Sequence, residues 1–184
     1  MIRVTFFAPV LITGGTQRHL QQVLRLLDPR RFTARVVTLR AGGEVAAELE
    51  AAGVSVTALG IDRLTTPGAI AGMVRTARVL RADGVQIVHG FQWRPSLVGT
   101  IVGRLAGVPV VLAGKRSLTG GDATARLAWR VMARGVDAIV ANADALRTEA
   151  EAQGVSARWE IIPNGVDVDW FRVGPPDPAA KTAL

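Results

Sequence analysis

Short apolar runs alternate with segments of helical period along almost the whole chain, and this alternation limits the possible folds more than any other feature. The apolar runs have the length of buried strands and lie at residues 2–9, 32–39, 54–59, 85–89, 108–113, 138–141 and 159–162. Most of them lack the polar alternation of a half-exposed strand, which indicates a parallel sheet with helices on both faces. The repeated βα units therefore predict an α/β fold, a Rossmann-like, doubly wound and mainly parallel sheet of about seven strands.

The segments between these runs carry the start and stop signals of α-helices. We expect helices at residues 17–27, 44–52, 67–82, 96–106, 123–134 and 144–153. Pro67 suits the first turn of its helix, and Gly53 and Gly154 suit the position just past a helix end. In the helix at 67–82, the helical period predicts an inward face made of Ile70, Met73, Val74, Ala77 and Leu80.

Length and C-terminal composition bear on the domain organisation. The chain has 184 residues, enough for one α/β domain with a buried core but too few for two. We expect this domain to span residues 1–173. The run from Gly174 to Pro178 has the composition of a linker, so residues 174–184 are interpreted as an interdomain linker and the start of a further domain.

Composition excludes several classes of enzyme. There is no cysteine, and His19 and His89 are the only histidines, which excludes thiol nucleophiles and disulfides and argues against a dedicated metal site. Neither the paired carboxylates of a glycosidase nor the G-x-S-x-G turn of a hydrolase is recognisable. We therefore expect no metal and no cofactor.

Neither a signal peptide nor a convincing membrane span is recognisable. Residues 1–4 run directly into the first apolar run, without a basic n-region or a cleavage site. The apolar stretch at 95–114 is interrupted by Arg104, Pro109 and several glycines, which favours a helix followed by a buried strand. We expect a cytoplasmic protein, either free in solution or peripheral on the inner face of the membrane.

Positive charge is concentrated in one segment of the chain. The formal net charge is +7, and residues 94–134 hold seven basic side chains and one acidic side chain. Such a segment suits phosphates, nucleotides or anionic lipid. Within it, Arg126 and Arg130 recur at an interval of four with Trp129 beside them. These three residues are candidates for contact with an anionic membrane, and a solvated helix face is the alternative.

Ligands of doubly wound sheets bind beyond the carboxyl ends of the strands, so the loops that follow the strands are candidate sites. Gly14 and Gly15 come after the first strand and before a helix. Backbone N–H groups at this position can contact a phosphate. The alternative is a tight turn that needs a positive φ. The run is not the G-x-G-x-x-G of a dinucleotide site.

Two later loops carry polar side chains. His89 ends the fourth strand and is followed by Gln92, Trp93 and Arg94. These side chains can hydrogen-bond sugar hydroxyls and stack on a sugar ring, and His89 can move protons, with a structural histidine as the alternative.

The loop after the fifth strand holds Lys115, Arg116 and Ser117. The two cations could bind a phosphate or offset the charge of a leaving group, and solvated surface charge is the alternative.

Several motifs occur together in an order that is familiar. The Gly14-Gly15 turn is followed by Arg18-His19-Leu20, then Ile87-Val88-His89, the run from Gly103 to Val111, and Ala138-Ile139-Val140-Ala141-Asn142. The most specific motif is Ile162-Pro163-Asn164-Gly165-Val166-Asp167. Over about residues 1–175 the chain resembles the N-terminal domain of the retaining glycosyltransferases of family 4, which have two Rossmann-like domains in the GT-B architecture.

The resemblance implies the acceptor-binding half of a retaining glycosyltransferase of the hexosyltransferase type. Such an enzyme moves a sugar from a nucleotide-sugar donor to a hydroxyl of a sugar, lipid-linked or small-molecule acceptor. Gly14 and Gly15 match the turn against the donor phosphates, and His89 matches a cleft histidine. Many members carry another histidine where this chain has Lys115 and Arg116. We therefore expect His89 and Lys115 to be catalytic. Gly14, Gly15 and Arg116 are expected to bind the donor phosphates. The residues expected to bind the acceptor are Gln92, Trp93, Arg94 and Ser117.

The resemblance also implies that most donor contacts lie in a C-terminal domain outside this chain, so we expect the chain to be inactive alone. The alternative is a non-catalytic recruiting or acceptor-binding subunit that pairs with a separate donor-binding chain. A nicotinamide-dependent dehydrogenase is disfavoured, because the glycine fingerprint is absent and the second strand closes on Thr38-Leu39-Arg40 without an acidic residue. We expect no nucleic acid partner.

Overall fold

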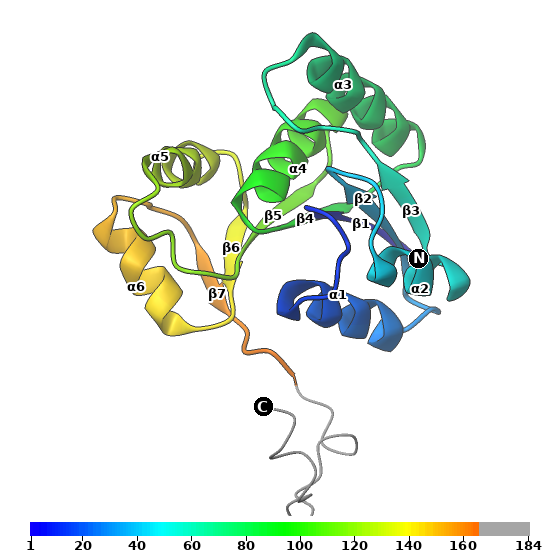
Figure 1. Ribbon diagram of the computed structural model, residues 1–184, viewed down its shortest axis with the longest axis horizontal. Helices are drawn as coiled ribbons and strands as arrows, with labels where there is room; N and C mark the ends of the chain where they lie inside the picture. The colour runs from blue at the N-terminus through cyan, green and yellow to red at the C-terminus, as the bar shows by residue number, and fades with distance from the viewer. Residues whose placement is uncertain (166–184) are drawn as a thin grey trace, which may run out of the picture.

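The computed structural model describes residues 1–165, which form one seven-stranded sheet flanked by six helices (Figure 1). The elements are, in chain order, β1 Ile2–Ala8, α1 Gly15–Leu26, β2 Phe32–Thr38, α2 Glu44–Ala51, β3 Ser55–Ala58, α3 Pro67–Ala82, β4 Ile87–Phe91, α4 Trp93–Ala106, β5 Val110–Lys115, α5 Ala123–Met132, β6 Ala138–Ala141, α6 Asp144–Ala152 and β7 Trp159–Ile161. All strand pairs are parallel, and the spatial order is β3-β2-β1-β4-β5-β6-β7. The predicted doubly wound sheet is confirmed. The predicted domain end at residue 173 and the linker at 174–184 lie outside the described residues.

Helices cover both faces of the sheet, as predicted (Figure 1). α1 and α2 lie on one face, and α3, α4 and α5 lie side by side on the other. α6 lies next to α5, where the Arg130 Nε donates a hydrogen bond of 2.6 Å to the Gln153 carbonyl. Separate apolar clusters fill the space between sheet and helices on the two faces. Burial on both sides explains why the strand sequences lack polar alternation.

The helix α3 agrees with its predicted bounds but differs in the face that it buries. The Thr66 hydroxyl accepts a hydrogen bond of 3.2 Å from the Ala69 amide and so caps the helix start. The buried positions are Ala69, Met73, Ala77 and Leu80. Ile70 is 52% exposed, so its predicted inward position is wrong. Met73, Ala77 and Leu80 are buried as predicted and Val74 is partly buried, but Ala69 rather than Ile70 begins the buried stripe.

The predicted loop after the fourth strand is almost absent. β4 continues to Phe91 and α4 begins at Trp93, so Gln92 alone joins them, and the predicted helix start at residue 96 is wrong. Gln92 has φ 69° and is the sole non-glycine residue with positive φ within residues 1–165. Its amide donates to the Gly114 carbonyl (2.9 Å), and its carbonyl accepts from the Ser96 amide (3.0 Å). These two bonds hold a backbone conformation that is otherwise costly.

Gly90 allows α4 to approach β4 at this point, and Gly114 allows β4 and β5 to pack closely beside it. A Cβ added at Gly90 would lie 2.3 Å from the Ser96 Cα, and one added at Gly114 would lie 2.7 Å from the Gly90 carbonyl oxygen. Ser96 is fully buried, and its hydroxyl accepts a hydrogen bond of 3.2 Å from the Gly114 amide. Neither glycine has a positive φ, so the fold requires their small size rather than their conformational freedom.

A buried ion pair ties the end of β5 to α6. Lys115 is 1% exposed, and its Nζ lies 2.9 Å from a carboxylate oxygen of Glu149 and 2.7 Å from the Thr119 hydroxyl. The same carboxylate accepts hydrogen bonds from the backbone amides of Thr119 and Gly120. Desolvation raises the pKa of Glu149, but these amide bonds and Lys115 outweigh it and lower the pKa from 4.5 to about 2. One carboxylate therefore orders the loop that follows β5.

We expect Gly90→Ala to lower the free energy of unfolding by about 2–3 kcal/mol, because the added methyl overlaps backbone atoms that cannot rotate away. Urea unfolding followed by circular dichroism measures this. The matched control is Gly68→Ala in α3, where an added Cβ meets nothing within 4 Å. The control should be neutral or slightly stabilising. Equal stability of the two variants would contradict the close approach of α4 to β4.

We expect Glu149→Gln to cost about 3 kcal/mol, because it leaves the Lys115 charge buried without a counterion. The exposed pair Arg18–Glu48 provides the control, and Glu48→Gln should change the stability by less than about 1 kcal/mol. The pH dependence follows from the lowered pKa of Glu149, whose contribution is fully present above about pH 4.5 and is lost as the pH falls towards 2. A wild type and a Glu149→Gln variant with parallel stability curves between pH 5 and about 2.5 would contradict this role.

Candidate functional site

The carboxyl ends of β1 and β4 are neighbours, which makes them the point where the strand order reverses. A cavity of about 170 Å³ opens there, and we call it the crevice cavity. Its lining comes from the loop after β1, the start of α1 and the loops after β5, β6 and β7: Gly15, Thr16, His19, Arg116, Asn142 and Asn164. The predicted location of the site is therefore matched by a cavity with mainly polar walls.

Arg116 is the cation of the crevice cavity. Its guanidinium carbon lies 4.8 Å from the centroid of the Phe91 ring, and its Nη1 donates a hydrogen bond of 3.0 Å to the Asn164 side chain. Burial lowers the pKa of Arg116, but a guanidinium remains charged in proteins. The Nε of Arg116 is buried without a hydrogen-bond partner among the described residues. A fixed, partly desolvated cation with a free donor is suited to an anionic ligand.

Two imidazoles adjoin this cation, and both are held in the neutral form. Burial, then the charge of Arg116, then His19 lower the pKa of His89 from 6.5 to about 3. Burial and Arg116 also lower the pKa of His19. The His89 ring lies 4.7 Å from Phe91 between ring centroids, and its Nε2 is buried with no partner within the described part of the chain. At neutral pH His89 can therefore exchange hydrogen bonds but not supply a positive charge.

The glycine turn lies against the crevice cavity through Gly15, which opens α1. The first turn of α1 contains no acidic residue, and Gly14, its N-cap, makes no side-chain cap bond. Several backbone amides of this turn are therefore available to an anion, and the helix dipole adds to the field of Arg116. Gly14 has φ −177°, and neither glycine has a positive φ, which excludes the alternative of a tight turn.

A second cavity of about 160 Å³ lies beside the first, and Arg116 lines both. We call it the side cavity, and it is lined by Gln92, Trp93, Arg116, Ser117, Leu118, Thr119, Asp122, Ala125 and Trp129. It brings together Gln92, Trp93 and Ser117, three of the four residues predicted to bind an acceptor. The fourth, Arg94, is exposed and lies over the Trp93 ring, 5.0 Å from its centroid, outside the lining of the cavity.

Lys115 does not reach either cavity. It was predicted to share the crevice with Arg116, but successive residues of a strand point to opposite faces. Lys115 consequently turns inward to Glu149 and lies 5.4 Å from the Trp129 ring centroid. The predicted position of Lys115 in the crevice is wrong, and a catalytic role for it has no structural support.

The predicted membrane contact of Trp129 is also wrong. Trp129 is 3% exposed and belongs to the apolar cluster between α5, α6 and the sheet. The outward face of α5 instead shows Leu127 and Val131, which are 61% and 53% exposed. The Arg130 side chain donates a hydrogen bond to the Gln153 carbonyl, and Arg126 is partly exposed.

His19, Asn142 and Asn164 were not assigned a role from the sequence, although they line the crevice cavity. Asn142 follows the last residue of β6, and Asn164 lies three residues beyond β7. His19 lies four residues after Gly15, which places it one helical turn into α1 on the same face. The two asparagines could therefore have been predicted as site residues from their position after the carboxyl ends of strands. His19 could have been predicted from its helical spacing to Gly15.

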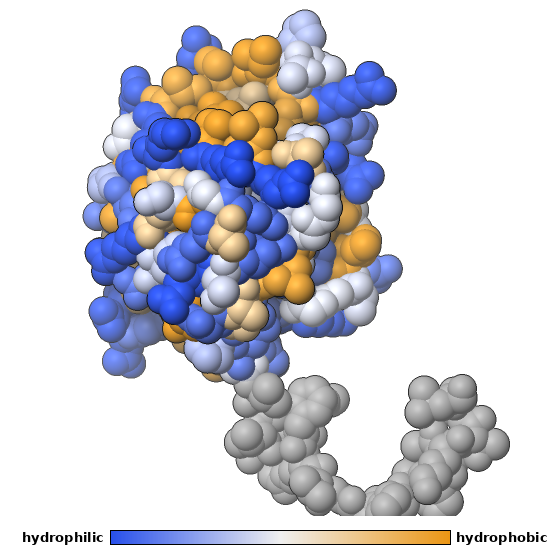
Figure 2. All heavy atoms as spheres, turned by 90° about the vertical axis from the view of Figure 1, so that its left-hand side faces the viewer, coloured by the Kyte–Doolittle hydropathy of each residue, from blue (hydrophilic) through white to orange (hydrophobic). Residues whose placement is uncertain are grey.

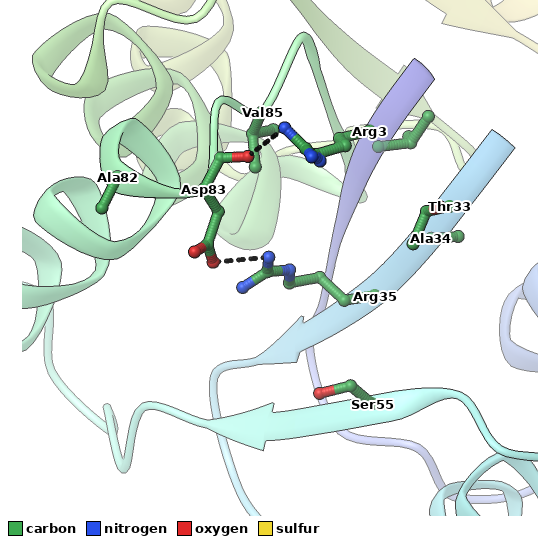
Figure 3. A pocket seen from close by; sticks show the side chains of 9 residues that line it. Arg3, Thr33, Ala34, Arg35, Ser55, Ala82, Asp83 and Val85 are labelled. Atoms are coloured by element: carbon green, nitrogen blue, oxygen red, sulfur yellow. Dashed lines mark hydrogen bonds and ion pairs between the residues drawn. The ribbon is translucent and has the colours of Figure 1, made fainter. Parts of the chain in front are cut away.

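A cavity of about 550 Å³ lies at the opposite edge of the sheet (Figure 3). It is bordered by the amino ends of β1, β2 and β3. Its two arginines are both bound by Asp83, Arg35 through a 2.6 Å ion pair and Arg3 through a 2.9 Å hydrogen bond to the carbonyl. No buried polar atom without a partner belongs to its lining. We therefore place the site at the carboxyl edge, where such atoms gather.

Among residues 1–165, no three or more histidine or carboxylate side chains form a group that could hold a metal ion. No helix in the same residues is long and apolar enough to cross a bilayer.

Comparison with known proteins gives a consistent family. A family model described as Glycosyltransferase Family 4 matches residues 13–170. The D-inositol 3-phosphate glycosyltransferase 1 of Catenulispora acidiphila is 35% identical over 121 residues, which cover 56% of this chain and 28% of that protein.

Solved structures show the same fold at low sequence identity. HepE of Anabaena, in complex with UDP and glucose, matches with a TM-score of 0.76 and 17% identity over 95% of this chain and 48% of its own. A glycosyltransferase of Rickettsia africae matches with a TM-score of 0.75 and 15% identity over 99% of this chain and 48% of its own. The chain spans about half the length of these proteins and has the fold of one half of the GT-B architecture. Since the family match extends from the glycine turn beyond β7, the chain belongs to glycosyltransferase family 4.

Proposed function

We propose that the chain is the acceptor-side half of a retaining glycosyltransferase that moves a hexosyl group from a nucleotide-sugar donor to a hydroxyl acceptor. The observation that carries this proposal is the position of Arg116, which lines the crevice cavity and the side cavity at once. One cavity has the features of an anion site, and the other has hydrogen-bonding groups and an indole ring. A transfer reaction needs such a junction, where the leaving phosphate and the attacking hydroxyl meet.

The donor side of the proposal rests on charge. Arg116 and the first turn of α1 at Gly14 and Gly15 would contact the diphosphate, and the neutral His19 would donate or accept a hydrogen bond. UDP in the complex of HepE supports a nucleotide diphosphate as the ligand of this fold. The cation stabilises the negative charge that develops on the leaving phosphate, which is the largest contribution that a residue at this place can make.

His89 has a different role in this proposal. His89 lines neither cavity but packs against Phe91, whose ring lies under Arg116. Because its imidazole is neutral and its Nε2 lacks a partner within residues 1–165, it can accept a hydrogen bond from a sugar hydroxyl that reaches this position. We infer that it orients the sugar, and that charge stabilisation by Arg116 replaces a dedicated base.

The acceptor side rests on Gln92, Trp93 and Ser117. An amide, an indole and a hydroxyl at the wall of a small cavity fit the hydroxyls and one ring face of a polyol or sugar. The acceptor named for the relative from Catenulispora acidiphila is a phosphorylated inositol. A phosphorylated polyol in the side cavity would also reach Arg116, so acceptor phosphate and donor phosphate would share one cation.

Turnover in this proposal requires a second Rossmann-like domain, in the same chain or in a separate one. The crevice cavity is open, and its walls offer no described group for a nucleotide base or ribose beyond Thr16 and the two asparagines. The residues of this chain alone would therefore bind a nucleotide sugar weakly and transfer no sugar.

We expect residues 1–184 to bind inorganic pyrophosphate and UDP only weakly, and Arg116→Ala to reduce this affinity by about 10- to 100-fold, the value of one charge-assisted contact. Chemical-shift titration by NMR measures binding in this range. Arg40→Ala is the matched control, because Arg40 is exposed at the same edge of the sheet and lines neither cavity. Equal losses in the two variants, or micromolar binding of a nucleotide sugar by the wild type, would contradict the proposal.

The two histidines allow a direct test of the electrostatics. In an NMR titration of the imidazole protons from pH 8 to about 5, we expect His89 to stay neutral and His19 to titrate below its ordinary pKa. Bound pyrophosphate should raise the pKa of His19, because a nearby anion favours the imidazolium. His19→Gln assigns the two signals. A His89 signal that titrates near pH 6.5 would show that Arg116 and burial do not act on it as described.

A further inference from the structure

Charge is segregated between the helices of this domain. α3, α4 and α5 carry seven arginines and no acidic residue: Arg75, Arg78, Arg81, Arg94, Arg104, Arg126 and Arg130. α1, α2 and α6 carry three arginines and six acidic residues. Since α3, α4 and α5 lie side by side on one face of the sheet, their outer surface is predominantly basic, with Asp83 and Asp122 at helix ends and Asp137 beside Arg104 (Figure 1). We call this surface the basic face.

Large apolar side chains are exposed on the same helices. Ile101 and Leu105 of α4 are 40% and 51% exposed, and Leu127 and Val131 of α5 are 61% and 53% exposed. Each pair is separated by four residues and so forms a stripe along the outside of its helix. On α3, Ile70 and Val79 are also exposed, but they are nine residues apart and flank the buried stripe on opposite sides, so they form no stripe of their own. In Figure 2 an apolar area is visible near the top of the molecule, bordered by hydrophilic side chains. On α1, α2 and α6, Leu26 alone is a large apolar side chain with comparable exposure.

Part of the positive charge on the basic face has no internal counterion. Arg81 donates to the carbonyls of Leu105 and Ala106, and Arg104 pairs with Asp137. No hydrogen bond or ion pair within residues 1–165 involves the side chains of Arg75, Arg78 and Arg126. Arg78 also borders a cleft of about 180 Å³ between α3 and α4, whose other walls are Val74, Ala77, Arg81 and Leu105. Uncompensated guanidinium groups thus lie directly beside exposed aliphatic groups.

We propose that the basic face docks on the surface of an anionic lipid bilayer. Arginine with aliphatic side chains on one face matches the two components of a bilayer surface, anionic headgroups and acyl chains. A nucleic acid fits less well, because these helices hold only two aromatic residues: Trp129 is buried, and Trp93 lines the side cavity with Arg94 over its ring. An acidic protein partner would pair with the arginines, but it gives no reason for the aliphatic stripes of α4 and α5 to stay exposed.

The basic face is continuous with the side cavity. α4 and α5 both begin at the carboxyl edge of the sheet, at Trp93 and Ala123. Leu118, which lines the side cavity, is 63% exposed beside the start of α5. An acceptor with a lipid anchor could therefore present its polar head to Gln92 and Ser117 while its chain stays in the bilayer. This link to the acceptor rests on the proposed function, whereas docking of the basic face does not.

Co-sedimentation of the 184-residue chain with vesicles tests the proposal. The wild type should bind vesicles that contain phosphatidylglycerol, and the bound fraction should fall as salt is added. It should not bind vesicles of pure phosphatidylcholine. The triple variant Arg75→Gln, Arg78→Gln and Arg126→Gln should bind the anionic vesicles about 100-fold more weakly, at about fivefold for each charge near the surface. Leu127→Ser with Val131→Ser should also weaken binding, and at high salt as well as low.

The matched control removes three exposed arginines elsewhere, Arg25→Gln, Arg30→Gln and Arg40→Gln, and should retain wild-type binding. Equal losses in control and test variants would show attraction by net charge alone and overturn the proposal. The proposal would also fail if the wild type bound both vesicle types equally, or bound RNA at physiological salt but no vesicles.

Pyrophosphate binding by the same variants separates this proposal from the proposed function. None of the substituted residues lines the crevice cavity, so the variants should bind pyrophosphate like the wild type. If the wild type binds vesicles but not pyrophosphate, membrane docking of the basic face is supported and the proposed function fails. If it binds pyrophosphate but not anionic vesicles, only the docking proposal is overturned.

Discussion

The close approach of α4 to β4 at Gly90 shapes the carboxyl edge of the sheet. Because no side chain separates the helix from β4 there, the chain turns from strand to helix within one residue, Gln92. The same contact carries the Trp93 ring to the wall of the side cavity and leaves room for Arg116 over Phe91. A glycine that binds no ligand itself thus helps to place Gln92 and Trp93 at the wall of the side cavity.

The order and type of the elements followed from sequence, because burial on both faces leaves a strong apolar pattern in each strand and the helices carry local stop signals. The start of α4 did not follow, since nothing within Gly90-Phe91-Gln92 indicates how closely a distant Ser96 backbone approaches. The same applies to Trp129 and Lys115. An arginine repeat defines a helix face but not which neighbour covers the next position, and Lys115 is turned inward by Glu149, which is 34 residues away in the sequence. Long-range packing decided each case in which local pattern failed.

The crevice concentrates positive charge in a single group. Burial, and then the charge of Arg116, lower the pKa of both histidines, so the field at the carboxyl edge has one source with a fixed direction instead of three that vary with pH. A ligand phosphate would meet the same field throughout the neutral range. On the outer surface of α3, α4 and α5 the arginines produce a broader and more exposed field, which salt screens much more strongly.

The carboxylate of Glu149, held against the amides of Thr119 and Gly120, has a consequence for recognition. It immobilises the segment that carries Ser117 and Leu118 when the domain folds, before any acceptor arrives. An acceptor would therefore lose less binding free energy to the ordering of its own site. Selection for a different acceptor could act through α6, a helix that touches no ligand, by loosening or shifting this clamp. Substrate range in this chain would then depend on how rigid one loop is, as well as on the side chains that it displays.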